Sequence, residues 1–226
     1  MLLATFALWR RDIVRFYRQR SRIVGALGTP IVFWLLLGSG LGSSFRVDPT
    51  AASEGGYLEY FFPGTLALII LFTAIFSTIS VIEDRHEGFL QGVLVAPIPR
   101  TAIVLGKILG GTTLAVMQAS LFLLLAPLAN IHIGWTSLPM MILVLTTLAF
   151  SVTGLGFVLA WILDSTQGFH AIMNLLLMPM WLLSGAFFPV PALALDPTGG
   201  VMHWIMRLNP LTYGVAGLRR LMFGPI

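Results

Sequence analysis

The chain has 226 residues, of which 57% are hydrophobic and 10% are charged; a soluble domain has roughly 45–50% apolar residues. It contains no cysteine, which excludes disulfides, thiolate metal sites and cysteine nucleophiles. The composition therefore predicts an all-α polytopic membrane protein, built from apolar segments of about 20 residues that cross the bilayer.

Positive charge is concentrated at the N-terminus, where six arginines lie in the first 22 residues beside one acid, Asp12. This position indicates a cytoplasmic segment that faces anionic lipid, and not a nucleic-acid partner, despite the net charge of +4. At 100° per residue, residues 5–22 predict an interfacial helix whose aromatic face meets the acyl boundary. Its opposite face includes Arg11 and Arg15. A plain basic flank of the first span is the alternative.

Five later segments are apolar and long enough to cross a membrane. The predicted spans are residues 23–41, 60–82, 101–126, 138–163 and 168–188. With the N-terminus inside, nine lysines and arginines lie at the inner side and four outside, in agreement with the positive-inside rule. The whole chain is therefore expected to be one transmembrane domain of the cytoplasmic (inner) membrane.

Two glycines in the third span, Gly106 and Gly110, have the spacing that permits close helix approach. Residues 189–207 mix proline, glycine and aspartate with apolar residues, a composition that predicts a re-entrant segment at the outer side. The last 18 residues contain two arginines and are too short and too charged to be assigned as a sixth span.

A compact charged segment, "EDRHE" at residues 83–87, separates the second and third spans. It lacks the second histidine of a zinc-binding H-E-x-x-H helix, and Gly106-Lys107 does not fit a phosphate loop, so neither a metal site nor ATP binding is expected. The residues after it form a short helix with an apolar face that Pro97 ends. Residues 83–97 therefore predict a cytoplasmic helix that docks into another protein, with a simple cap on the second span as the alternative.

Two motifs resemble those of a known family. The stretch "EDRHEGFLQGVLVAPIPRTAIVLGKI" at residues 83–108 is similar to the coupling region of type 2 ABC transporter permeases, which export drugs, lipooligosaccharides and polysaccharides. The segments "LSGAFFPV" (183–190) and "LNPLTYGVAGLRRLMFG" (208–224) resemble the closing signature of the same family. Such permeases usually have a sixth span after this signature. A chain that stops at Ile226 is accordingly expected to be truncated or to have an unusual tail.

The resemblance implies the membrane half of an ATP-driven exporter, with two permease copies and two ATPase subunits. ATP and Mg would be bound by the separate ATPase, so this chain is expected to be no enzyme and to hold no cofactor. The ATPase would dock on the N-terminal helix and on residues 83–97. The expected docking residues are Glu83, Asp84, Arg85, Glu87, Phe89, Leu90, Arg11 and Arg15.

Polar residues at membrane depth face protein or a water-filled path, because lipid offers them no partner. Hydrogen bonds between helices, worth about 0.6 kcal/mol each, are the plainer explanation. The candidates for a substrate path are Asn174, His170, Ser77, Phe61 and Phe187, although the two phenylalanines also fit an aromatic belt. Because no buried charge is expected in the spans, the substrate is expected to be hydrophobic or amphipathic: a drug, a lipid or a lipid-linked glycan.

Two other functions are open at this point. An intramembrane lipid-modifying enzyme would use Asp84, His86 and Glu87 as its acid/base group and would act without an ATPase. A purely structural anchor subunit would not stimulate an ATPase in response to substrate.

Overall fold

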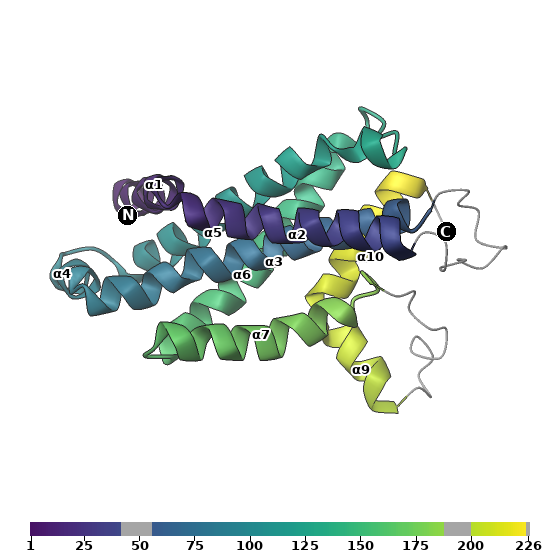
Figure 1. Ribbon diagram of the computed structural model, residues 1–226. Helices are drawn as coiled ribbons and strands as arrows, with labels where there is room; N and C mark the ends of the chain where they lie inside the picture. The colour runs from purple at the N-terminus through teal and green to yellow at the C-terminus, as the bar shows by residue number, and fades with distance from the viewer. Residues whose placement is uncertain (42–55, 188–199, 225–226) are drawn as a thin grey trace.

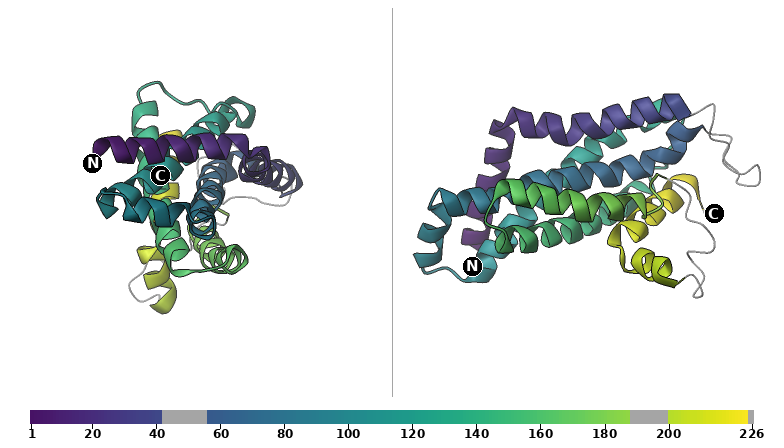
Figure 2. Two further views of the ribbon diagram at one scale, coloured as in Figure 1. Left: turned by 90° about the vertical axis from the view of Figure 1, so that its left-hand side faces the viewer. Right: turned by 60° about the horizontal axis from the view of Figure 1, so that its bottom comes forward.

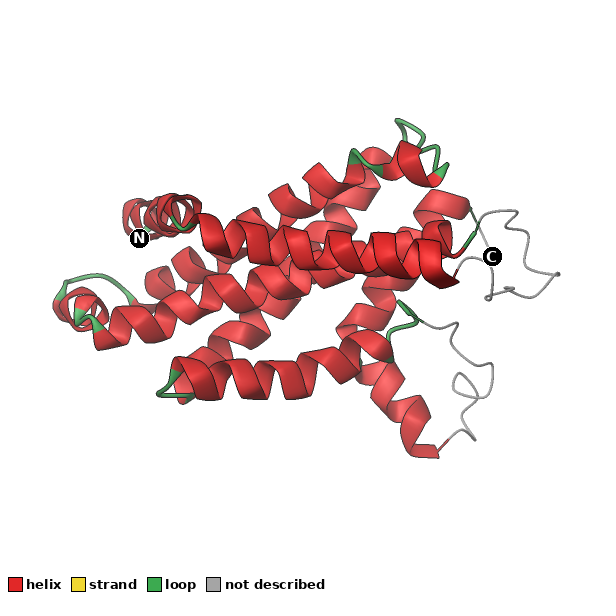
Figure 3. Ribbon diagram, in the orientation of Figure 1, coloured by secondary structure: helices red, strands yellow, loops and turns green. Residues whose placement is uncertain are grey.

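The computed structural model describes residues 1–41, 56–187 and 200–224 (Figure 1). All regular elements within these ranges are helices, which confirms the predicted all-α class (Figure 3). Five helices run along the bundle: α2 (Arg20–Leu41), α3 (Tyr57–His86), α5 (Arg100–Leu123), α6 (Leu138–Ile162) and α7 (Thr166–Leu182). In the described ranges, α2, α3, α5 and α6 are long and apolar enough to cross a membrane. The fifth predicted span is the shorter α7, of 17 residues.

Helix α3 is the centre of the bundle, because it packs against α2, α5, α6, α7 and α10. All its residues from Phe61 to Leu71 are buried. A helix that is apolar on every side belongs inside a bundle and not on its surface. The other spans therefore use α3 as their common partner.

The remaining helices lie at the two ends of the bundle. Helix α1 (Leu2–Arg18) lies across one end, where α4 (Phe89–Val95) is also found (Figure 2). The short η1 (Ala126–Ala129), α9 (Gly200–Leu208) and α10 (Pro210–Phe223) lie toward the opposite end. We call these the α1 end and the α10 end.

Several predicted boundaries differ from the observed ones. The interfacial helix stops at Arg18, and α2 already begins at Arg20, so the last three residues of the predicted segment 5–22 belong to the first span. The predicted coupling segment 83–97 is divided, because α3 continues to His86 and Gly88 then adopts a φ of 76°. Glycine tolerates this left-handed conformation, which ends a helix sharply. Of the predicted re-entrant segment 189–207, residues 189–199 lie outside the described ranges and the rest are in α9.

Glycines on α5 let α1 approach closely. A Cβ on Gly106 would lie 2.8 Å from the Cβ of Leu8, and one on Gly110 would lie 3.3 Å from the Cβ of Asp12. The small-residue spacing in the third span therefore serves contact with α1. Close approach of this kind is what such spacing permits in membrane helices.

At the α10 end, residues of the two closing-signature segments (183–190 and 208–224) bond to one another and to α3 and α7. Asn209 caps α10 through a bond from the Leu211 N–H, and its amide donates to the Met180 carbonyl of α7 at 2.6 Å. Arg219 of α10 donates to the carbonyl of Gly185 at 3.0 Å. The hydroxyl of Tyr60 on α3 reaches the same carbonyl at 3.1 Å. These bonds join α3, α7 and α10 at the α10 end of the bundle.

The glycine contact between α1 and α5 can be tested by adding one methyl group. Gly106→Ala is expected to destabilise the protein, because the clash with Leu8 costs about 1–3 kcal/mol and outweighs the higher helix propensity of alanine. Gly154→Ala in α6 is the control, since nothing lies within 4 Å of its added Cβ. Thermal unfolding of the purified chain in detergent should show a lower midpoint for the first variant only. Equal midpoints would contradict the close packing of α1.

Candidate functional site

A buried lysine lies where α1, α3 and α5 meet. The Lys107 ammonium is 2.9 Å from Oδ1 of Asp12 and 3.2 Å from the hydroxyl of Ser80, and it also pairs with Asp84. Its relative exposure is 6%. A lysine is found buried in this way almost only when it is paired, so these partners hold α5 against both other helices.

Asp84, near the end of α3, is the acceptor at the centre of the site. Its exposure is 0%. Arg11 of α1 donates to both carboxylate oxygens, at 2.7 and 2.9 Å, and Arg15 pairs with the same carboxylate. A two-pronged arginine–carboxylate pair fixes orientation as well as distance. Asp84 of α3 thus binds two arginines of α1 and helps to fix α1 across the bundle end.

The network continues outward from this buried centre. Arg15 also pairs with Glu83 and Glu87, each at 3.0 Å, and Arg22 of α2 pairs with Glu83. We call the whole set the charge network; it contains four cations and four carboxylates, namely Arg11, Arg15, Arg22, Lys107, Asp12, Glu83, Asp84 and Glu87. Its formal charge is balanced, which is the condition for burying charges at tolerable cost.

The surroundings of α1 change the ionisation of its charged groups. Burial raises the pKa of the Asp12 carboxyl, and the adjacent Lys107 ammonium offsets part of this rise. Hydrogen bonds to Asp84 raise the pKa of Arg11 above its ordinary value. The Lys107 ammonium thus favours the charged form of Asp12, while Arg11 stays a cation in any case.

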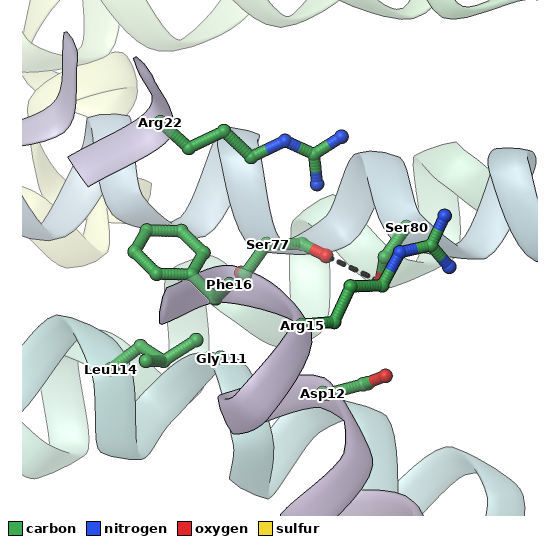
Figure 4. Close-up of a pocket in the computed structure, with 8 residues that line it drawn as sticks. All are labelled: Asp12, Arg15, Phe16, Arg22, Ser77, Ser80, Gly111 and Leu114. Carbon is green, nitrogen blue, oxygen red and sulfur yellow. Dashed lines mark hydrogen bonds between the residues drawn. The ribbon is translucent and has the colours of Figure 1, made fainter. Parts of the chain in front are cut away.

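A small cavity lies beside the network (Figure 4). Asp12 and Phe16 of α1, Ser77 and Ser80 of α3, and Gly111 of α5 are among its lining residues. Its volume of about 10 Å³ is close to the minimum that holds one water molecule. The cavity is far too small for a substrate.

Besides its contacts in the charge network, the end of α3 is bonded to α6. Arg85 pairs with Asp164 at 2.9 Å and donates to the carbonyls of Ala160, Trp161 and Leu163 at the end of α6. His86 bonds the Asp164 carbonyl at 2.7 Å. The guanidinium thus satisfies carbonyls that the helix itself leaves without a partner.

Helix α4 is attached to the network by its inner face. The Arg11 guanidinium lies 3.6 Å from the ring centroid of Phe89, a cation–π contact. Leu90 is buried against Leu8 and Ile103. The outer face of α4 presents Gln91 and Val95, and Val95 is 87% exposed.

These contacts place the expected docking residues in two groups. In the first group the side chain is already bound inside this chain. Six residues lie in the charge network or pack beneath α4, and Arg85 is bonded to α6; the six are Arg11, Arg15, Glu83, Asp84, Phe89 and Leu90. The second group is Glu87 alone, which is paired with Arg15 but remains exposed. Asp84 and Leu90 therefore lie where a docked subunit would not touch them in this conformation, because internal cations and side chains cover them. The docking role of the more accessible residues stays a prediction.

The five expected path residues do not form one surface. Asn174 is exposed on α7, and His170 packs edge-on against Phe76. Ser77 lines the small cavity. Phe61 is fully buried, in an aromatic cluster with Trp181 and Phe187. Of the three polar residues in this set, Asn174 is exposed, while His170 and Ser77 are half-buried.

The sequence interpretation missed Lys107 and Asp12 as site residues. It also expected no buried charge in the spans, and Lys107, inside the third predicted span, shows that this was wrong. The missed signal was available, because an ionisable residue within a span is by default a functional candidate with a partner. The second missed signal was Asp12, the one acid among the N-terminal arginines, which is a partner of this lysine.

Comparison with known proteins now decides the family. Residues 4–223 match the ABC-2 type transporter family. The chain belongs to this family. Relatives of this ABC-2 protein include Nodulation protein J of Rhizobium meliloti (strain 1021), 27% identical over 96% of this chain and 80% of the relative. Nodulation protein J of Rhizobium leguminosarum bv. trifolii is 28% identical over the same shares. The inner membrane transport permease YadH of Escherichia coli (strain K12) is 25% identical over 96% and 82%.

Membership of this family shows in what kind of protein the charge network lies. The ABC-2 chain is a multi-pass transmembrane permease, and the network lies at one end of its membrane-spanning bundle. The family resemblance seen in the two sequence motifs is thereby confirmed.

Removing the buried lysine tests the network. Lys107→Met is expected to destabilise the permease by about 3–5 kcal/mol, because the buried Asp12 then keeps only its 3.5 Å pair with Arg11 and the buried Asp84 loses one of its countercharges. Thermal unfolding in detergent measures the effect. The control is Arg10→Gln, which also removes one positive charge, from an exposed residue with no salt bridge to any described residue.

A second variant separates charge from packing. Asp12→Asn combined with Lys107→Met should recover part of the lost stability, since the buried carboxylate that lost its lysine partner is then gone. A single Lys107→Met variant as stable as Arg10→Gln would contradict the assignment of this network as the joint between α1, α3 and α5.

Proposed function

We propose that this permease is the membrane subunit of an ATP-driven exporter and that a separate ATPase subunit docks on the outer face of α4. The observation that supports this most directly is the division of α4 into two faces. Its inner face is fixed to α1 and α5 through Phe89 and Leu90, while Gln91 and Val95 point away from the protein. The exposed Val95 beside the exposed Gln91 would offer a partner both an apolar and a polar contact on one helix face.

The charge network would transmit a movement of α4 to the other helices of the bundle. A push on α4 acts on Arg11 through the Phe89 ring, and Arg11 shares Asp84 with Lys107. Displacement of α4 would thus reach α1, α3 and α5 together. ATP and Mg would be bound and turned over in the partner subunit, and this chain would supply only the mechanical connection.

A second permease copy completes the proposed transporter. Helix α2 carries several exposed apolar residues on its outward side, and α7 does the same around Leu175. A second copy that packs there would leave Asn174 near the interface, where the substrate would pass. The exposed apolar side chains of α2 and α7, among them Val32, Phe33 and Leu175, favour a hydrophobic or amphipathic substrate such as a drug, a lipid or a lipid-linked glycan.

The alternative of an intramembrane enzyme gains no support from the candidate acid/base residues. Asp84 is bonded to cations, His86 to the Asp164 carbonyl and Glu87 to Arg15. The three side chains thus face different partners. A shared catalytic group would require them to converge on one substrate position.

Docking on α4 can be tested by placing a charge on its outer face. Val95→Asp is expected to abolish transport and ATPase co-purification, because an apolar groove does not accept a carboxylate without a partner. Since Val95 is exposed, the variant should keep the thermal midpoint of the native chain. The matched control is Leu128→Asp at the α10 end, which is 70% exposed in the native protein. Equal loss of ATPase in both variants would contradict the site.

The absence of cysteine makes the orientation testable with single labels. Gln91→Cys should react with a membrane-impermeant maleimide in inside-out vesicles only, because the α1 end is proposed to be cytoplasmic. Trp135→Cys, at the α10 end, should react in right-side-out vesicles only. The reverse pattern would place α4 out of reach of a cytoplasmic ATPase and would overturn the proposed function.

A further inference from the structure

An apolar groove lies between α5 and α6 at the α1 end of the bundle. Its volume is about 290 Å³, and its walls are almost wholly apolar. The side chains that line it are Leu94 of α4, Ile103 and Val104 of α5, and Phe157, Val158 and Trp161 of α6. Because α5 and α6 are both membrane spans, the groove opens toward hydrocarbon.

One cation stands at the edge of this groove. Arg100, the first residue of α5, is exposed and lines the groove. Its guanidinium makes no salt bridge or hydrogen bond with another residue in the described parts of the chain. Asp164, which follows α6, is already paired with Arg85 of α3. The protein therefore supplies no anion for Arg100.

The depth of the groove agrees with the level of lipid headgroups. Trp161 is partly exposed, and the Arg85 guanidinium lies 5.7 Å from its ring centroid. Tryptophans at membrane interfaces mark the headgroup level. Arg100 stands at the end of the same groove, while Val104 and Phe157 lie toward its inner part. A cation at headgroup level beside an apolar groove matches one molecule that carries both a phosphate and an acyl chain.

We propose that this groove binds an anionic phospholipid of the surrounding bilayer, with one acyl chain between α5 and α6 and the headgroup phosphate on Arg100. Basic sites between spans on the cytoplasmic side are known to select anionic lipids. The lipid would also cover Leu94 on the inner side of α4. The site thus adjoins the proposed docking helix but does not depend on an ATPase.

The probe for this site is quenching of Trp161 fluorescence by lipids with brominated acyl chains. The full chain is placed in phosphatidylcholine vesicles that contain a minor fraction of brominated phosphatidylglycerol or of brominated phosphatidylcholine. Because the chain has six tryptophans, the signal of Trp161 is the difference between the native chain and Trp161→Phe. Selective binding appears as stronger quenching by the brominated phosphatidylglycerol at equal mole fraction.

Two variants and one control decide the outcome. Arg100→Gln should lower the preference for phosphatidylglycerol about fivefold, the effect of one arginine near an anionic surface. Val158→Phe should reduce quenching by both lipids, because it fills the groove. Arg10→Gln removes an exposed arginine of α1 at the same end of the bundle and should change neither result.

Equal quenching by the two lipids in the native chain overturns the proposal, since it reports only ordinary lipid contact. An equal loss of preference in Arg100→Gln and Arg10→Gln also overturns it, because the attraction would then be general. Absence of Trp161 quenching means that protein covers the groove, either a second copy or another subunit, and likewise overturns it. None of these measurements involves transport or ATP, so failure here leaves the proposed function standing.

Discussion

The placement of the helices at the α1 end depends on one buried ion pair, Lys107 with Asp84. Neither charge could remain inside the protein alone, because a single unpaired ion costs several kcal/mol to bury. The pair is acceptable only while Arg11, Arg15 and Asp12 surround it. Three helices from distant parts of the sequence are therefore held in one arrangement, and loss of any partner affects all of them.

The two ends of the bundle are held by different chemistry. At the α1 end, charges join the helices. At the α10 end, side chains bond to backbone carbonyls, as Asn209 and Arg219 do, and aromatic rings fill the space between helices. The first arrangement can change when a charged partner moves. The second is local and fixed, so motion of the spans relative to α3 is expected to begin at the α1 end.

Much of this architecture could be predicted from the sequence, because spans and their order follow from apolar length alone. The interfacial helix also left a clear signal in its charge, whereas the break near Gly88 was missed and residues 83–97 were predicted as one segment. The direction of the charged side chains could not be predicted. Arg11 and Arg15 look like a solvent-facing stripe on a helical wheel, and only the crossing of α1 over α5 turns them toward Asp84.

The faces of α4 were hard to predict for the same reason. Phe89 and Leu90 are the large apolar residues at the start of that helix and so suggested a contact with another protein. In the folded chain this apolar part is used internally, against Leu8 and Ile103. Gln91 and Val95, on the opposite face, are left for a partner. Hydrophobicity in sequence indicates burial, but it does not tell which molecule provides the cover.

The bonds from Arg85 to the last carbonyls of α6 have a consequence for the bilayer itself. With its 25 residues, α6 is about 37 Å long, more than the roughly 30 Å of hydrocarbon it crosses. Fraying would ordinarily absorb the excess, but this terminus has its carbonyls occupied and cannot unwind cheaply. The mismatch must then be met by inclination of the helix or by local thickening of the membrane. The permease is thus expected to respond to the chain length of the lipids around it.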